Sequence, residues 1–177
     1  MTLEKKLKSI IRDVPNFPKE GIVFKDLTTV LLNPELTNEV VDALANAIEE
    51  KPDAITAIES RGFWFGTLIA QKLGVPFIPL RKKGKLPAET ERIEYNLEYG
   101  SAVIEIHKGH IQKGWKVMIH DDLLATGGTA IAAAKLIEKE GGIVHSFNFL
   151  VNLSFLGASA VINKEYPKVP VSSIVTF

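Results

Sequence analysis

Residues 117–129 of the sequence, VMIHDDLLATGGT, combine an apolar run, two adjacent acids and a turn of small residues. The apolar run is short enough for a buried strand, and we expect the strand to break at Asp121 and Asp122. Residues 130–140 are rich in Ala, Leu, Ile, Lys and Glu, which favours a helix. A strand, a small-residue turn and a helix aim backbone N–H groups and a positive helix end at one point. Such a point binds an anion, most readily a phosphate.

The small-residue turn suits a single phosphate held by neutral donors. Two glycines let the backbone approach an anion closely, and the hydroxyls of Thr126 and Thr129 can donate to it. The lysine of a nucleotide-binding P-loop and the three glycines of a dinucleotide fingerprint are both missing. Asp121 and Asp122 would repel a phosphate, so we expect them near ribose hydroxyls, a developing positive charge or a hydrated metal ion. A helix cap beside a solvated acidic pair is the alternative, but it explains neither the doubled acid nor the doubled glycine.

The composition favours a single domain in the cytoplasm. A chain of 177 residues with 46% hydrophobic content can bury one good core, and its formal net charge of +0 argues against bulk attraction to nucleic acid or an anionic membrane. The chain has no cysteine, which excludes disulfides and thiol chemistry. Residues 2–13 lack the apolar core of a signal peptide. Residues 141–163 carry no Asp, Glu, Lys or Arg, but their Asn, His and Ser content favours an α/β core over a membrane span.

Two further turns carry cations. A strand over 54–59 is expected to end at Ser60-Arg61-Gly62, before a helix over 63–73, and arginine can bind a phosphoryl group through two parallel hydrogen bonds. A strand over 75–80 precedes Arg81-Lys82-Lys83-Gly84-Lys85, a positive edge that is otherwise a solvated loop. The connection over 81–100 is predicted to be a long irregular segment, and such segments often act as lids.

The alternation of strands and helices predicts the α/β class, with a parallel sheet flanked by helices. Strands near Ala54, Val75, Trp115 and Ile143 alternate with helical segments. Further helices are expected over 2–13, 35–51 and 155–163, and a last strand over 171–177. The right-handed crossovers of such a sheet bring the loops at the strand ends to one rim, so the three anion-suited turns should converge.

Residues 121–129, DDLLATGGT, resemble the phosphoribosyl-pyrophosphate (PRPP) signature of type I phosphoribosyltransferases, in the form typical of the adenine-specific branch. The resemblance covers essentially the full chain. It implies one domain over 1–177, with a small N-terminal hood (approximately 1–34) on a core (approximately 35–177). It also implies transfer of phosphoribosyl from PRPP to N9 of adenine, giving AMP and pyrophosphate in purine salvage. A homodimer is expected, with Mg²⁺ bound mainly through oxygens of PRPP and pyrophosphate and no metal site of the protein's own.

The resemblance also assigns roles to individual residues. Tyr95 to Gly100, YNLEYG, is similar to the family's YxLEYG segment, which makes Glu98 an acid/base beside the purine, whereas a surface carboxylate is the alternative. The loop at Ser60 typically contains a strained non-proline cis peptide in the family. Asp121 and Asp122 join Glu98 as the expected catalytic residues. The expected PRPP-binding residues are Ser60, Arg61, Arg81, Lys82, Lys85, Asp121, Asp122, Ala125, Thr126, Gly127, Gly128 and Thr129.

Adenine is expected on the segment Val23-Phe24-Lys25. From the residues alone, Phe24 is better explained as a core side chain of a capping strand. The resemblance reverses that judgement, because backbone groups at Val23 and Lys25 read the base in the family, Phe24 stacks on it and Leu123 covers its other face.

Two positions depart from the family pattern, and three rival functions remain open. His120 is interpreted as a satisfied core histidine, and Asn152 stands where an acid is common. The first rival function is specificity for hypoxanthine or guanine, which relatives read with a lysine that is missing from 129–134. The second is a purine- or PRPP-sensing regulator, which would normally carry a DNA-binding domain. The third is a purely structural domain.

Overall fold

The protein is built on one seven-stranded sheet, in a computed structural model that describes residues 1–96 and 100–177. The strand order is β5-β6-β4-β3-β7-β8-β9. Strands β3, β4, β7, β8 and β9 are parallel, and β5 and β6 form an antiparallel hairpin at one edge. The strand bounds are β3 Ala54–Ile58, β4 Phe77–Lys82, β5 Thr90–Asn96, β6 Ser101–His107, β7 Lys116–Leu124, β8 Ile143–Asn152 and β9 Val171–Thr176.

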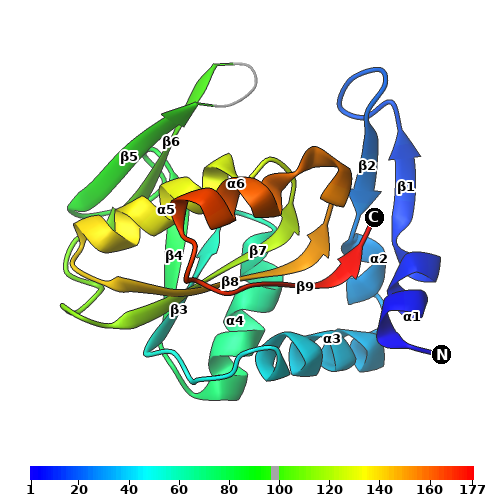
Figure 1. Ribbon diagram of the computed structural model, residues 1–177, viewed down its shortest axis with the longest axis horizontal. Helices are drawn as coiled ribbons and strands as arrows, with labels where there is room; N and C mark the ends of the chain where they lie inside the picture. The colour runs from blue at the N-terminus through cyan, green and yellow to red at the C-terminus, as the bar shows by residue number, and fades with distance from the viewer. Residues whose placement is uncertain (97–99) are drawn as a thin grey trace.

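Helices cover both faces of this sheet (Figure 1). One face carries α3 (Pro34–Asn46) and α4 (Gly62–Leu73), and the other carries α5 (Gly128–Lys139) and α6 (Ala158–Glu165). The α/β class with a mostly parallel sheet flanked by helices is therefore confirmed. Two apolar cores lie on the two faces, with Val117 and Ile119 of β7 in one and Met118 in the other. No described helix, in 1–96 or 100–177, is long and apolar enough to cross a membrane.

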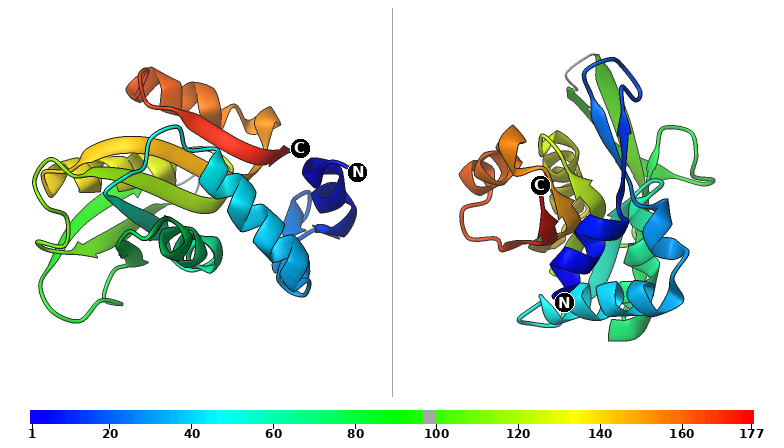
Figure 2. Two further views of the ribbon diagram at one scale, coloured as in Figure 1. Left: turned by 90° about the horizontal axis from the view of Figure 1, so that it is seen from below. Right: turned by 90° about the vertical axis from the view of Figure 1, so that its right-hand side faces the viewer.

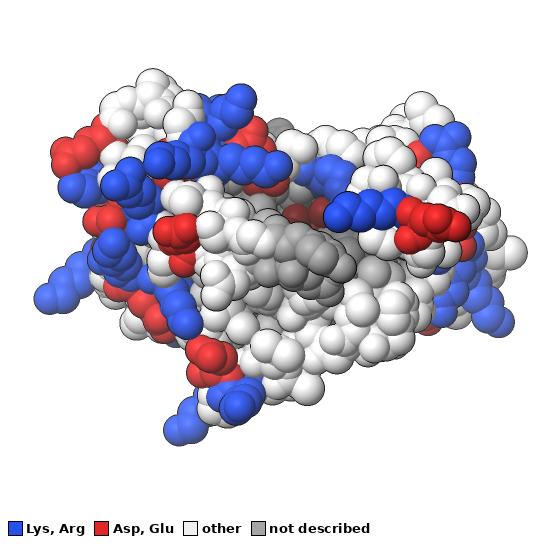
Figure 3. All heavy atoms as spheres, turned by 90° about the horizontal axis from the view of Figure 1, so that it is seen from above, with Lys and Arg blue, Asp and Glu red and all other residues white. Residues whose placement is uncertain are grey.

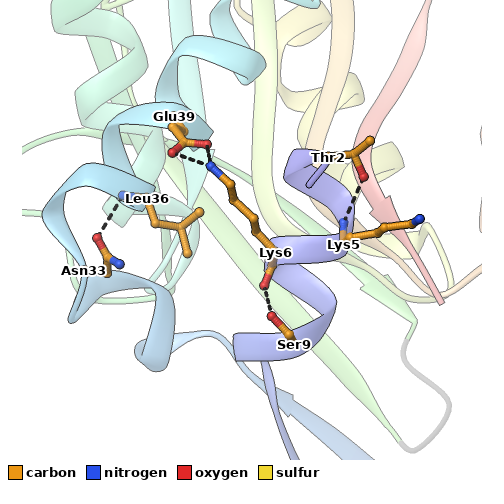
Figure 4. Close-up of polar contacts among 7 residues, drawn as sticks. All are labelled: Thr2, Lys5, Lys6, Ser9, Asn33, Leu36 and Glu39. Carbon is orange, nitrogen blue, oxygen red and sulfur yellow. Dashed lines mark hydrogen bonds and ion pairs between the residues drawn. The ribbon is translucent and has the colours of Figure 1, made fainter.

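The N-terminal segment forms a unit of its own beside the sheet (Figures 1 and 2). It contains α1 (Leu3–Ile10), β1 (Arg12–Pro15), β2 (Val23–Asp26) and the short α2 (Thr28–Leu31), and β1 and β2 pair as a separate two-stranded sheet. Figure 4 shows Lys6 of α1 paired with both carboxylate oxygens of Glu39 on α3, at 2.8 and 2.7 Å. Thr2 caps α1, and Asn33 caps α3 ahead of Pro34.

The expected break of β7 at the two acids is wrong. The strand continues to Leu124, because β8 pairs with it through Asp121↔Phe149, Leu123↔Val151 and Leu124↔Asn152. Backbone pairing with a neighbouring strand outweighs the poor strand propensity of two aspartates. The acids are consequently held by a rigid strand rather than by a loop.

The prediction of a long irregular segment over 81–100 is also wrong for most of its described length. Arg81 and Lys82 belong to β4, and residues 90–96 form β5, paired with β6 from Thr90↔His107 to Asn96↔Ser101. The strand pattern was hard to see because β5 has only two apolar side chains, Ile93 and Tyr95.

Two helices differ from their predicted bounds. Helix α3 ends at Asn46 rather than at residue 51. The expected helix over 155–163 is a 3₁₀ turn, η1 (Ser154–Leu156), followed by α6, because Gly157 has a φ of 71° and separates them. The remaining predicted elements are present with shifts of a few residues at their ends.

His120 is buried, as predicted, but only one of its two ring nitrogens is hydrogen-bonded among the described residues, so the prediction of a satisfied core histidine is only half confirmed. Its Nδ1 lies 3.0 Å from Oδ1 of Asn148, whose Nδ2 donates to the carbonyl of Leu44 and to Oγ of Ser172, both at 3.2 Å. Its Nε2 has no hydrogen-bond partner among the described residues. Burial lowers the pKa of His120 to about 4.

His120 should make the protein less stable in mild acid. An unfolded histidine has a pKa of about 6.5, so the unfolded chain binds a proton below that pH while the folded protein does not until about pH 4. Stability should therefore fall as pH drops through this window. Denaturant unfolding of the protein and of His120→Gln between pH 4 and 7 measures the effect, and the variant should show a shallower pH dependence. Parallel curves would contradict it.

Candidate active site

Three loops meet at the carboxyl ends of neighbouring strands. Strand β3 lies between β4 and β7, so the residues after β3, β4 and β7 are adjacent along one rim of the sheet. The hairpin β5–β6 and the pair β1–β2 both rise beside this rim (Figures 1 and 2). Figure 3 looks onto it and shows Lys and Arg side chains bordering a hollow. The convergence predicted from the sequence is thus confirmed.

An ion pair joins the first and third loops. Nε of Arg61, at the start of α4, lies 2.9 Å from Oδ2 of Asp122, whose side chain is only 4% exposed. Within residues 1–96 and 100–177, neither that oxygen nor Nη1 of Arg61 has a hydrogen-bond partner, so the contact is an ion pair without hydrogen-bond geometry. Gly62 packs directly on the acids, since a Cβ there would lie 2.9 Å from Oδ1 of Asp121. The peptide bond between Glu59 and Ser60 is cis, as the family resemblance led us to expect.

The two aspartates hold protons more tightly than ordinary carboxyls. Burial raises the pKa of Asp121 well above its usual range, and the neighbouring Asp122 raises it further. Burial also raises the pKa of Asp122, although the Arg61 guanidinium opposes that rise. Oδ1 of Asp121 accepts the backbone N–H of Asp122 at 2.9 Å. Ionisation of such a buried pair becomes more favourable when a positive charge lies next to it.

Residues 125–129 after β7 form an open turn, the candidate anion cradle. Helix α5 begins at Gly128, and its first turn has neither a side-chain cap nor an acidic residue, so its free N–H groups face the turn. Gly127 has a φ of 87°, and a Cβ there would also press on the carbonyl of Ala158 at 3.3 Å. The concavity at this turn measures about 70 Å³ and is bordered by Asp121 and Thr126. Oγ of Thr129 lies 3.4 Å from the hydroxyl of Tyr95, which ties the cradle to β5.

The cationic turn after β4 is fixed by two glutamates. Glu59 accepts Nη2 of Arg81 at 2.8 Å and the backbone N–H of Lys82 at 3.0 Å. Its pKa is lowered, chiefly by the hydrogen bond from Arg81. Glu105, 5% exposed, accepts the N–H of Gly84 at 2.9 Å.

The arginine and the lysines of this turn are used differently. Arg81 also donates Nη1 to the carbonyl of Lys85, at 2.8 Å. Among residues 1–96 and 100–177, the ammonium groups of Lys82, Lys83 and Lys85 form no ion pair. Arg81 therefore stabilises the turn through its hydrogen bonds, and the ammonium groups of the three lysines can bind an anion.

The side chains of Phe24 and Lys25 on β2 both make close contacts. The guanidinium of Arg61 lies 4.8 Å from the ring centroid of Phe24, and Phe17 meets that ring edge-on at 5.1 Å. Nζ of Lys25 pairs with Asp13 at 2.6 Å. Val23 is exposed. Phe24 is half-buried and absent from both cores, so the reading of Phe24 as a core side chain is not supported.

The structure brings most of the predicted site residues to one place. Arg61, Phe24 and Asp122 are in contact, and Leu123 packs partly buried at the end of β7. Glu98 lies outside the described residues. The sequence reasoning missed Glu59 and Glu105, although a charged residue at the end of a buried strand, as at Glu59, is a usable signal. The sequence also did not predict the contact between Tyr95 and Thr129 in the turn after β7.

A protein-made metal cage is not found in the described part of the chain, where no three His, Asp or Glu side chains lie together as ligands would. The donor set does fit Mg²⁺ held in another way. Mg²⁺ usually keeps several waters and binds one or two carboxylates together with substrate phosphates. The adjacent oxygens of Asp121 and Asp122, beside a phosphate cradle, supply such acceptors.

Comparison with known proteins gives consistent matches. The phosphoribosyl transferase domain family matches residues 26–167. The chain is 55% identical over 157 residues to the adenine phosphoribosyltransferase of Thermoanaerobacter sp. (strain X514), covering 88% of this chain and 90% of that protein. The solved adenine phosphoribosyltransferase of Thermoanaerobacter pseudethanolicus superposes with a TM-score of 0.93 at 48% identity, covering 99% and 100% of the two chains. That of Saccharomyces cerevisiae, complexed with an imino-altritol bisphosphate and adenine, gives 0.88 at 41%, covering 97% of each.

Replacing Asp121 by Asn should stabilise the protein. Because the folded state holds this proton more tightly than the unfolded chain, stability falls as pH rises above about 3.9, the ordinary pKa of aspartate. The amide removes that loss, so the Tm of Asp121→Asn at pH 7 should rise by about 2–4 °C. Calorimetry at pH 7 and at pH 4 measures the gain, which should shrink at the lower pH. A lower Tm at pH 7 would refute the inference.

Proposed function

We propose how this chain, which belongs to the phosphoribosyl transferase family and within it to the adenine phosphoribosyltransferases, holds its substrates at the sheet rim. It transfers phosphoribosyl from PRPP to N9 of adenine, which gives AMP and pyrophosphate. The observation that carries the proposal is the Arg61–Asp122 ion pair, which joins two anion-suited loops beside the uncapped start of α5.

The 5′-phosphate of PRPP binds at Ala125 to Thr129. Backbone N–H groups at the start of α5 donate to its oxygens, and the hydroxyls of Thr126 and Thr129 add two more donors. The left-handed backbone at Gly127 lets the chain turn closely around the phosphate. Residues 125–129 contain no cationic side chain, so neutral donors and the positive end of α5 hold this phosphate.

The ribose lies against Asp121 and Asp122, whose oxygens accept its hydroxyls. As the bond from C1′ to pyrophosphate loosens, the sugar gains positive charge, and the buried carboxylates favour that charge. The rigidity of β7 keeps them in place, so little reorganisation is needed at the moment of reaction. If the pair contributes about 3 kcal/mol, neutralising it would slow turnover roughly a hundredfold.

Pyrophosphate leaves along the two cationic loops. Ser60 and Arg61 follow β3, and Arg81, Lys82 and Lys85 lie at the end of β4. Mg²⁺, bound mainly through oxygens of PRPP and pyrophosphate, would neutralise the charge that develops on the leaving group. Glu59 acts as a positioning residue here, because it fixes both the Arg81 guanidinium and the Lys82 backbone.

Adenine binds on β2. Backbone groups of Val23 and Lys25 read its edge, and Phe24 and Leu123 cover its two faces. Arg61 lies 4.8 Å from the Phe24 ring, which supports a position of the base beside the loop after β3. Glu98, which follows β5 in the sequence, acts as an acid/base on the purine. Residues 81–96, the described part of the segment that was expected to act as a lid, exclude water from the reacting sugar.

The assembly is a homodimer in the cytoplasm. Support for the dimer comes from the family resemblance alone, and sedimentation of the purified protein would measure the oligomeric state.

Adenine should be the preferred base. Incubation with PRPP, Mg²⁺ and one base at a time should release pyrophosphate with adenine at a rate at least about 100-fold above those with hypoxanthine or guanine. A backbone-read site built for a 6-amino group leaves polar groups unpaired against a 6-oxo group. Release with hypoxanthine or guanine at a comparable rate would overturn the base assignment, and binding of the protein to duplex DNA would favour a regulator.

The Glu59→Gln variant should weaken pyrophosphate-end binding selectively. The amide keeps an acceptor for the Lys82 N–H but loses the charge that holds Arg81, so the KM for PRPP should rise about five- to tenfold. The KM for adenine should change little. Glu50→Gln is the matched control, because Glu50 pairs with Lys116 at the amino end of β7. A lower Tm with an unchanged KM for PRPP would show that Glu59 stabilises the fold and does not position the PRPP-binding turn.

A further inference from the structure

Two cation–π contacts hold β2 on opposite sides. Phe24 and Lys25 are neighbours in a strand, so their side chains point in opposite directions. On one side the core supplies the cation, with Arg61 lying 4.8 Å from the Phe24 ring. On the other side the strand supplies it, with Nζ of Lys25 lying 3.9 Å from the ring centroid of Phe177. The Arg61 contact belongs to the site described above, whereas the Phe177 contact has no role in it.

The Phe177 ring is fixed to the core by its own backbone. Its N–H donates to the carbonyl of Asn152 at 2.9 Å, and its carbonyl accepts the N–H of Ser154 at 3.0 Å and the hydroxyl of Ser154 at 2.9 Å. These bonds hold the residue just after β9, beside the ends of β8 and η1. The ring itself packs, partly buried, against the core on the α3 side. Phe177 is therefore a fixed point against which another segment can be positioned.

The side chain of Lys25 contacts the Phe177 ring. This side chain is only 11% exposed, and its ammonium is shared between the Phe177 ring and Asp13 of β1. Lys8 of α1 also faces the ring, at 5.7 Å. Figure 1 shows the end of the chain beside β2 and α1, away from the hairpin β5–β6. A largely desolvated ammonium over an aromatic face is among the stronger forms of this contact.

Filling of the core is not sufficient to explain the arrangement. An apolar side chain at 177 would cover the same surface, but it would offer no π face to the Lys25 ammonium. The N-terminal segment is also held by the ion pair of Lys6 and Glu39 between α1 and α3 (Figure 4) and by apolar side chains in the core, whereas the contact with Phe177 is made by Lys25 of β2 itself.

We infer that Phe177 is a positioning residue for adenine, which acts by holding Lys25 and so sets the distance of β2 from the core. The inference rests on the proposed placing of adenine on β2. If backbone groups at Val23 and Lys25 read the base, a loosened strand should weaken adenine binding while leaving the phosphate cradle and the acids as they are.

Steady-state kinetics of Phe177→Leu test the inference. Loss of the ring face should raise the KM for adenine about three- to tenfold, with kcat and the KM for PRPP changed by less than about twofold. Phe177→Tyr keeps the ring and should restore the KM for adenine. Lys6→Ala is the matched control, because it removes the ion pair of α1 with Glu39 on α3 without touching β2, and its KM for adenine should stay unchanged.

A double-mutant cycle with Lys25→Met separates positioning from packing. In that background Phe177→Leu should have no further effect on the KM for adenine. Lys25→Met alone also tests the contact if Phe177→Leu does not fold. An unchanged KM for adenine in Phe177→Leu, or equal rises for adenine and PRPP, would overturn the inference.

Phe24→Leu shows which proposal has failed. If Phe24→Leu raises the KM for adenine and Phe177→Leu does not, only the Phe177 inference fails. If neither variant changes it, the placing of the base on β2 fails as well.

Discussion

The ion pair between Arg61 and Asp122 is the contact on which the candidate site depends. A carboxylate that is 4% exposed would be costly to ionise without a cation beside it, and Arg61 supplies that cation from the neighbouring strand end. The same guanidinium lies on the Phe24 ring. One side chain therefore contacts both an acid of β7 and strand β2, on which we propose that adenine binds. The close approach is possible only because residue 62 has no side chain to meet Asp121.

Function and stability oppose each other at the acidic pair. The fold keeps Asp121 and Asp122 buried next to one another, which raises the pKa of both and makes their ionisation unfavourable. Asparagine would suit the folded chain better at neutral pH, yet it would give no charge to a sugar that becomes cationic. His120, the residue before this pair on β7, is buried and its Nδ1 lies 3.0 Å from Oδ1 of Asn148 on the neighbouring strand β8.

The sequence was sufficient to predict the class, the parallel core and the meeting of three loops, because those follow from apolar runs, small-residue turns and strand-end geometry. It was insufficient where tertiary partners decide. Asp121 and Asp122 stay in β7 because β8 pairs with them, and β5 exists because β6 is beside it, although its own residues are mostly polar. Glu59 was overlooked because its partners, Arg81 and Lys82, are more than twenty positions away along the chain. Contacts of that range leave no local pattern.

The N-terminal strands form a sheet of their own, separate from the seven strands that carry the phosphate and ribose loops. In the proposed function, the base lies mainly on this N-terminal part and the sugar on the larger sheet. The two parts have separate backbone ladders, although Leu7, Ile11, Leu27 and Val30 pack into the core on the α3 side. Such a division makes the protein modular. A different base-reading segment could be grafted or recombined onto the same transfer machinery, provided that it brings an aromatic ring to Arg61, so specificity could diversify without reinventing the chemistry.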